Sequence, residues 1–202
     1  MILDYIINHY WLAGLIIVIL YVSDYYLTLL QSKMYHAGAK NTISLDGGIE
    51  LNPQWQKDIQ SLKKINPKFI IAVFLVIIMT GFIWLLSKSS GSMQPFEIVF
   101  GGFVLMEFFI HTRHFKSLFL YKSILQNKGV TGYIAYSRFF AHKSAAIDAM
   151  IFAVMYSIFG LFTNEILFFG GAVSCLSVAF AQKKWLKKIN LQKVISTQGV
   201  GN

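Results

Sequence analysis

Cysteine, proline and acidic residues are scarce in this sequence of 202 residues, and no familiar catalytic motif is present. The single cysteine, Cys175, excludes an intrachain disulfide and the cysteine-rich patterns of structural zinc sites. None of the three prolines lies inside a long apolar segment, which argues against the broken-helix ion sites of many transporters. The sequence also lacks a Gly-x-Ser-x-Gly element, a P-loop, a dinucleotide-binding fingerprint and an aspartate-rich magnesium motif. Hydropathy and charge are therefore the most informative features.

Apolar residues dominate the composition: hydrophobic side chains make up 55% and aromatic ones 16%, with a mean hydropathy of +0.56. These values are well above the soluble average. A bilayer core of about 30 Å needs roughly 20 helical residues, and five segments qualify as transmembrane helices: residues 6–30, 69–87, 96–113, 144–162 and 166–182. The last two are separated by only three residues, so a single bent hairpin is the main alternative. The prediction is an all-α membrane protein, a five-helix transmembrane bundle forming one integral membrane domain over residues 1–202.

Basic residues are segregated by these five segments. Lys and Arg collect on the cytoplasmic side of short loops, and 17 of the 18 lie between the first and second segments, between the third and fourth, or after the fifth. Only Lys88 lies on the other face. The N-terminus is therefore predicted outside and the C-terminus in the cytoplasm. The basic segments would face the anionic headgroups of the lipid bilayer, the predicted partner. They form no stripe within a folded soluble region, so nucleic acid is not predicted as a partner.

The predicted cytoplasmic segment 31–68 carries a strand-turn-strand pattern. Residues 42–51 alternate apolar and polar side chains around the dipeptide Asp46-Gly47, which predicts a small β-hairpin. A second alternating stretch, residues 131–137, predicts a short strand that is a candidate to join the hairpin.

An amphipathic helix is predicted over residues 53–64, where apolar residues recur at spacings of three and four. One interpretation places it on the inner membrane surface, with Trp55 in the headgroup zone. The other packs it on the cytoplasmic ends of the protein's own spans. In the first interpretation, the interfacial anchors are Trp55, Lys57, Lys63 and Lys64.

Three carboxylates fall within the predicted spans, at Asp24, Glu107 and Asp148. A charged group there costs roughly 2.5–3.5 kcal/mol at the bilayer centre, so each is expected to face a partner or a wet cavity. At about 1.5 Å per helical residue, all three lie within roughly 10 Å of the cytoplasmic interface. They predict an intramembrane polar cluster on the inner side.

Glu107, His111 and His114 are spaced four and three residues apart, which places them on one helix face. Carboxylate and imidazole groups on one face can ligate a divalent metal, the one cofactor that the sequence indicates. In the alternative without a cofactor, both histidines lie at the membrane surface, and Glu107 pairs with a cation or donates a hydrogen bond as the acid. A proton or ion relay is the third interpretation.

Four short segments, Asp24-Tyr-Tyr-Leu-Thr, Gly48-Ile-Glu-Leu-Asn-Pro, Gln56-Lys-Asp-Ile and His111-Thr-Arg-His, carry a resemblance to other sequences. Together they resemble a widespread set of small, uncharacterised bacterial multipass membrane proteins. The resemblance covers most of the chain and implies a single domain in a bacterial cytoplasmic (inner) membrane. It implies no activity, cofactor or site residue.

Three functional hypotheses remain open. The leading one is a non-enzymatic membrane protein, either an ion-binding or permeation protein or a scaffold. It would use the polar layer formed by the acids and histidines on the inner side of the membrane. Stripes of small residues in the fourth and fifth spans favour helix packing, within one chain or in a homo-oligomer. The alternative is a membrane-embedded, metal-dependent enzyme acting on a lipid-borne substrate. A third is a surface-responsive module built on the amphipathic helix.

Overall fold

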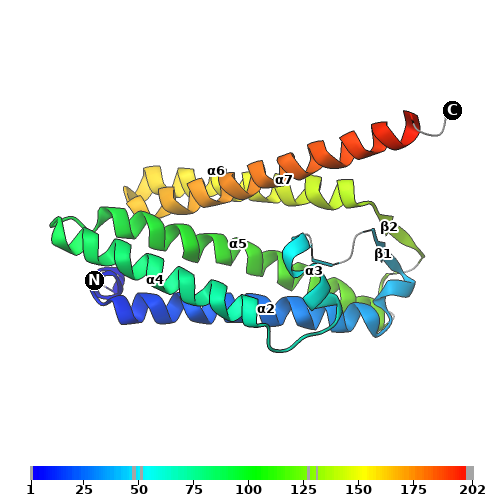
Figure 1. Cartoon of the computed structure of the whole chain (residues 1–202), viewed down its shortest axis with the longest axis horizontal. Helices are drawn as coiled ribbons and strands as arrows, with labels where there is room; N and C mark the ends of the chain where they lie inside the picture. The colour runs from blue at the N-terminus through cyan, green and yellow to red at the C-terminus, as the bar shows by residue number, and fades with distance from the viewer. Residues whose placement is uncertain (1, 47–48, 51, 127, 131, 199–202) are drawn as a thin grey trace.

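The structure is a computed structural model that describes residues 2–46, 49–50, 52–126, 128–130 and 132–198 (Figure 1). Long helices make up most of it. The helices are α1 (Ile2–Asn8), α2 (Tyr10–His36), η1 (Ala39–Asn41), α3 (Pro53–Gln60), α4 (Pro67–Ser89), α5 (Gln94–Leu125), α6 (Arg138–Thr163) and α7 (Ile166–Gln198). The strands are β1 (Ile43–Leu45) and β2 (Ile134–Tyr136).

Five of the described helices, α2, α4, α5, α6 and α7, are long and apolar enough to cross a membrane. Helices α4, α5, α6 and α7 each contain one predicted span, and α2 contains the first from residue 10 onward, so the chain is compatible with an integral multipass membrane protein. The predicted spans 144–162 and 166–182 belong to two separate helices. Asn164, between α6 and α7, adopts the left-handed conformation with φ of 57°, which ends α6 and allows the chain to turn.

The helices lie side by side along the long axis of the molecule, with α6 against α7, α7 against α5, and α5 against α2 (Figure 1). Helix α4 lies on α2 and α5, and only 6% of its most apolar window is buried. Alanines Ala145, Ala149 and Ala153 of α6 are all buried, which is the packing expected of a small-residue stripe. One end of the bundle carries α3, β1 and β2 and is called the sheet end below (Figure 1).

The first span begins later than predicted because residues 2–8 form the separate helix α1. His9 interrupts the helical backbone with φ of −116° and ψ of 88°. Its ring Nδ1 bonds the carbonyl oxygen of Tyr5 at 2.8 Å, which ties the imidazole back to α1. Helix α1 then packs through Ile7 against the start of α2 and against Phe96 of α5.

Strand β1 pairs in parallel with β2, joining Ile43 to Ile134 and Leu45 to Tyr136. The strand predicted within 131–137 is therefore present, and its partner is the first half of the predicted hairpin. The predicted hairpin over 42–51 includes residues 47, 48 and 51, which lie outside the described residues. Its turn and second strand stay a prediction.

Helix α3 is four residues shorter than the predicted 53–64. Asn52 caps its start by accepting a hydrogen bond from Gln54 N at 3.1 Å. The helix ends at Gln60 because Leu62 adopts a left-handed φ of 53°. The backbone N–H of Lys63 then bonds the carbonyl of Asp58 at 3.0 Å, which satisfies a terminal carbonyl.

Glycines set the separation of α5 and α7. A Cβ on Gly170 would lie 1.9 Å from the carbonyl oxygen of Ile98, and one on Gly101 would lie 2.2 Å from that of Leu167. Backbone occupies the space that a side chain would need at both positions, so the two helices are in direct main-chain contact.

We expect Gly170→Ala to lower the free energy of unfolding by about 1–3 kcal/mol, because the added methyl group overpacks the contact between α5 and α7. The matched control is Gly14→Ala, where a Cβ would meet its nearest neighbour at an ordinary 3.7 Å. Thermal unfolding of both variants in the same detergent checks this. Equal midpoints for the two variants would contradict it.

Candidate functional site

A polar cavity of about 470 Å³ opens at the sheet end between α2, α5, α7 and the segment that precedes α3. Both charged and aromatic side chains line it. The polar and charged ones on which the site depends are Asp24, Thr28, Gln31, Glu50, Arg113 and His114. The indoles of Trp55 and Trp185 form further walls.

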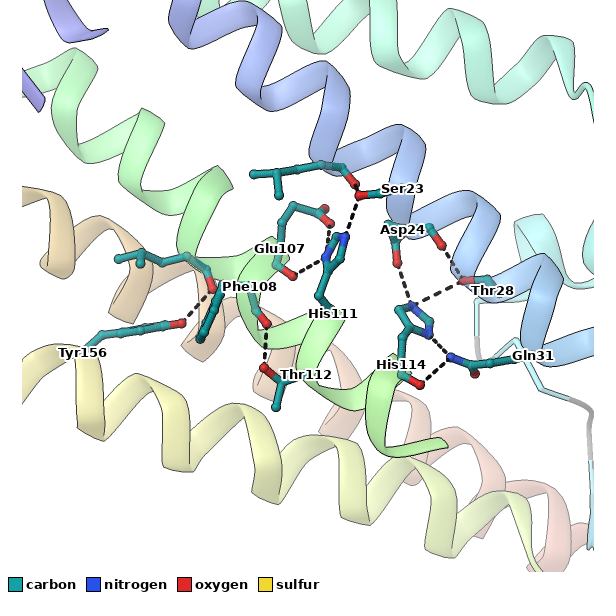
Figure 2. Close-up of polar contacts among 12 residues, drawn as sticks. Ser23, Asp24, Thr28, Gln31, Glu107, Phe108, His111, Thr112, His114 and Tyr156 are labelled. Atoms are coloured by element: carbon teal, nitrogen blue, oxygen red, sulfur yellow. Dashed lines mark hydrogen bonds and ion pairs between the residues drawn. The ribbon is translucent and has the colours of Figure 1, made fainter. Parts of the chain in front are cut away.

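Asp24 of α2 and His114 of α5 are joined by a short hydrogen bond (Figure 2). His114 Nε2 lies 2.6 Å from Asp24 Oδ1 and 3.3 Å from Thr28 Oγ1. Gln31 Nε2 bonds the other ring nitrogen, Nδ1, and also donates to the His114 carbonyl oxygen at 3.2 Å. An amide N–H at Nδ1 assigns the tautomer in which Nε2 carries the proton and donates it to the carboxylate.

The sequence builds this network by helical spacing. Asp24, Thr28 and Gln31 lie four and three residues apart, so they share one face of α2 and look toward α5. Thr28 and Gln31 are 5% and 4% exposed, and Thr28 Oγ1 donates to the Asp24 carbonyl oxygen at 3.0 Å. The carboxylate of Asp24 is thus held in place by its own helix and by α5.

Arg113 lies on the wall between this cavity and a second one of about 360 Å³ bounded by α2, α5 and α6. Its Nε lies 3.5 Å from Oδ2 of Asp148, which lines the second cavity. Within the described residues, the two Nη atoms make no hydrogen bond, so four N–H donors remain for a ligand. Asp148 is therefore paired with Arg113, whereas Asp24 is paired with His114.

Glu50 supplies a second carboxylate to the first cavity. Its Oε1 accepts a hydrogen bond from the backbone N–H of Asn52 at 2.7 Å. Burial raises the pKa of the Glu50 carboxyl, and the Asp24 charge acts in the same direction. The bond from Asn52 and the positive charge of Arg113 lower the pKa and oppose this shift. A cation in the cavity would offset the cost of charging Glu50.

Glu107 and His111 form a separate pair, deeper in the bundle than Asp24 and His114 (Figure 2). Glu107 is 3% exposed, and its Oε2 lies 3.8 Å from His111 Nδ1. The imidazole of His111 bonds the Glu107 carbonyl oxygen through Nδ1 at 2.7 Å and Ser23 Oγ through Nε2 at 2.6 Å. Within the described residues, Glu107 Oε2 has no hydrogen-bond partner.

The structure does not assemble Glu107, His111 and His114 into one ligand set. Both ring nitrogens of His111 and both of His114 are already engaged in the hydrogen bonds given above. In the described part of the chain, no three His, Cys, Asp or Glu side chains are placed to hold one metal ion. The predicted polar cluster is also divided: Asp24, Glu107 and Asp148 each take a different partner.

Helix α3 packs on the ends of α2 and α4. Ile59 is 2% exposed and lies against Tyr25 and Leu29, while Ser32 Oγ donates to the Ile59 carbonyl oxygen at 3.2 Å. Among the predicted anchors, Trp55 lines the polar cavity. The charged anchors Lys57, Lys63 and Lys64 are exposed on the outer side. Helix α3 thus packs on the protein's own spans, and contact of its lysines with the membrane surface stays a prediction.

Glu50, Arg113 and Gln31 were not predicted as site residues. A sequence signal existed for Gln31, which continues the helical spacing of Asp24 and Thr28. Glu50 and Arg113 lie within two of the segments that carry the family resemblance, but that resemblance assigns no role. In space, Asp24, Glu50 and Arg113 come from three of those segments and line one cavity.

We expect the Asp24 and His114 side chains to be coupled by about 1.5–3 kcal/mol, because hydrogen bonds to charged groups contribute in that range. A double-mutant cycle with Asp24→Ala and His114→Ala, followed by unfolding in detergent, measures this coupling. The control pair is Asp58 and Lys63, 3.6 Å apart, where Lys63 is 47% exposed and the coupling should stay below about 1 kcal/mol. A coupling no larger than that of the control pair would refute the assigned bond.

No protein-family model, curated protein or solved structure matches the chain. Function is therefore inferred from the geometry of the site.

Proposed function

We propose that this chain is a non-enzymatic protein of a bacterial cytoplasmic membrane that binds a small zwitterionic ligand in the polar cavity at the sheet end. In this proposal five helices span the bilayer with the N-terminus outside and the C-terminus in the cytoplasm. The sheet end then faces the cytoplasm, and its basic segments lie against anionic headgroups. The separation of 17 of 18 basic residues onto that side supports the orientation.

The proposed orientation predicts the labelling of single cysteines. In a Cys175→Ser background, Lys88→Cys should react with a membrane-impermeant maleimide in intact cells, and Lys57→Cys only after the membrane is opened. Both lysines are exposed, so burial does not limit either reaction. The reverse pattern would overturn the orientation, and labelling of both positions in intact cells would overturn the five-span count.

One observation carries the ligand proposal: a single cavity contains one guanidinium, Arg113, and two carboxylates, Asp24 and Glu50. The free Nη donors of Arg113 suit an anionic oxygen group, because guanidinium binds carboxylate and phosphate through paired hydrogen bonds. The two carboxylates suit an ammonium group. A ligand with both charges would satisfy both sides of the cavity, whereas a simple anion or a simple cation would satisfy only one.

Binding is a better account of this site than relay or metal chemistry. Asp24 and His114 are fixed by hydrogen bonds to Thr28 and Gln31, which gives a rigid wall with defined charge. The metal-dependent enzyme of the alternative hypothesis would need Glu107, His111 and His114 on one ion. Their hydrogen bonds direct them to different neighbours instead.

We expect glycerophosphoethanolamine, a soluble molecule with one phosphodiester and one primary amine, to bind the purified protein in isothermal titration calorimetry. Arg113→Gln should weaken this binding about 10- to 100-fold, because a charged hydrogen-bonded contact is lost. The control is Arg138→Gln, which removes the other arginine of the chain without touching the cavity lining.

The outcome is decisive in either direction. Binding that survives Arg113→Gln unchanged, or that falls equally with Arg138→Gln, would refute the role of the cavity. No saturable binding to the wild-type protein would refute the proposed ligand class.

A further inference from the structure

We infer that the ligand is a zwitterionic phospholipid of the inner leaflet, with its headgroup in the polar cavity and one acyl chain in an apolar groove beside it. This inference rests on the proposed function and names the source of the zwitterion. It follows from a second hollow of the molecule, from the place where the two hollows meet, and from the charges of the cavity.

The groove has a volume of about 660 Å³ and lies between α4, α5 and α7. Its walls are almost entirely apolar, as shown by Met79 of α4, Phe103 of α5 and Val173 of α7. Ser174 and Ser177 contribute hydroxyls, and that of Ser177 donates to the Val173 carbonyl oxygen at 2.9 Å. The groove therefore offers a hydrocarbon surface and suits an apolar chain.

The groove is long enough for one acyl chain. It follows α7 from Gly170 to Ala181, a rise of eleven residues and about 16 Å at 1.5 Å per residue. A hydrocarbon core is about 30 Å thick, so one leaflet contributes about 15 Å. In the proposed orientation, Ala181 lies at the inner end of the span 166–182 and Gly170 lies beyond its middle, so an acyl chain that begins near Ala181 would cross the inner leaflet and pass the bilayer centre.

The groove and the polar cavity share a wall. Val178 and Ala181 of α7 line both hollows, so the polar cavity and the groove are adjacent at the sheet end. A molecule that occupies both must have a charged head joined to a hydrocarbon chain. In the proposed orientation, the head would lie at the cytoplasmic interface and the chain would point to the bilayer centre, as in a phospholipid of the inner leaflet.

The charges in the cavity select the headgroup. A phosphoglycerol head carries only a negative charge, and it would meet Asp24 and Glu50 as well as Arg113. A phosphoethanolamine head places its phosphate at Arg113 and its ammonium at the two carboxylates. The cavity therefore favours a zwitterionic lipid over an anionic one with the same acyl chains.

Native mass spectrometry of the full chain in detergent tests this inference, with phosphatidylethanolamine and phosphatidylglycerol of identical acyl chains as the probes. We expect one retained phosphatidylethanolamine per chain, held about tenfold more tightly than phosphatidylglycerol. Val173→Trp fills the groove and should lower lipid retention about tenfold, while leaving the binding of soluble glycerophosphoethanolamine unchanged. Val154→Trp is the matched control, because Val154 is 55% exposed and Val173 60%, and Val154 lines neither hollow.

The possible results distinguish the lipid inference from the proposed binding of a small zwitterionic ligand. Equal retention of both lipids, or equal retention by Val173→Trp and Val154→Trp, would overturn the lipid assignment. A dimer mass that Val173→Trp abolishes would also overturn it, since a second chain would then occupy the groove. If glycerophosphoethanolamine binds but the lipid is not retained, only the lipid inference fails. If neither binds, the proposed function fails with it.

Discussion

In a helix surrounded by hydrocarbon, every polar side chain has to find its hydrogen-bond partner inside the protein. Several polar side chains of the bundle meet this constraint by bonding to a neighbouring helix, whereas Ser87 Oγ, Glu107 Oε2 and His142 Nε2 have no hydrogen-bond partner within the described residues. Tyr156 of α6 donates to the Leu105 carbonyl of α5 at 2.9 Å, and Trp84 of α4 donates to the Ile7 carbonyl of α1 at 2.9 Å. His114 meets Asp24 in the same way between α5 and α2. These bonds contribute, together with packing, to the choice of the face that each helix turns inward, because lipid offers no partner to a polar side chain.

The helix contacts are uneven, and this unevenness creates the site. Glycines bring α5 and α7 into main-chain contact at Gly101 and Gly170, where any side chain would collide. Toward the sheet end α7 diverges from α5 (Figure 1), and larger residues such as Arg113 and Trp185 line the space between helices. The same pair of helices thus provides a tight contact at one end and a cavity at the other. The close contact and the polar cavity therefore both follow from the pattern of residue size along α5 and α7.

The sequence was a good guide to what depends on composition and a poor one to what depends on helix register. Five long apolar helices follow from the apolar runs of the sequence. The partners of the polar side chains do not follow, because His111 and His114 share a face of α5 yet meet different residues of α2, Ser23 and Asp24. That choice depends on how α2 and α5 are aligned, which no periodicity encodes. Glu50 was missed for a related reason: it lies in an irregular segment, and only the packing of α3 on Tyr25 and Leu29 brings it to the cavity.

The ion pair between Arg113 and Asp148 is best understood as a positioning device. Both side chains are about one-third exposed, at 34% and 33%, so the pair contributes no more than about 1 kcal/mol to stability. It does fix the direction of the guanidinium, because Asp148 engages Nε and leaves the Nη donors available. A long arginine side chain without this contact would lose more conformational entropy when it binds a ligand. Asp148 of α6 therefore orients Arg113 without lining the polar cavity itself.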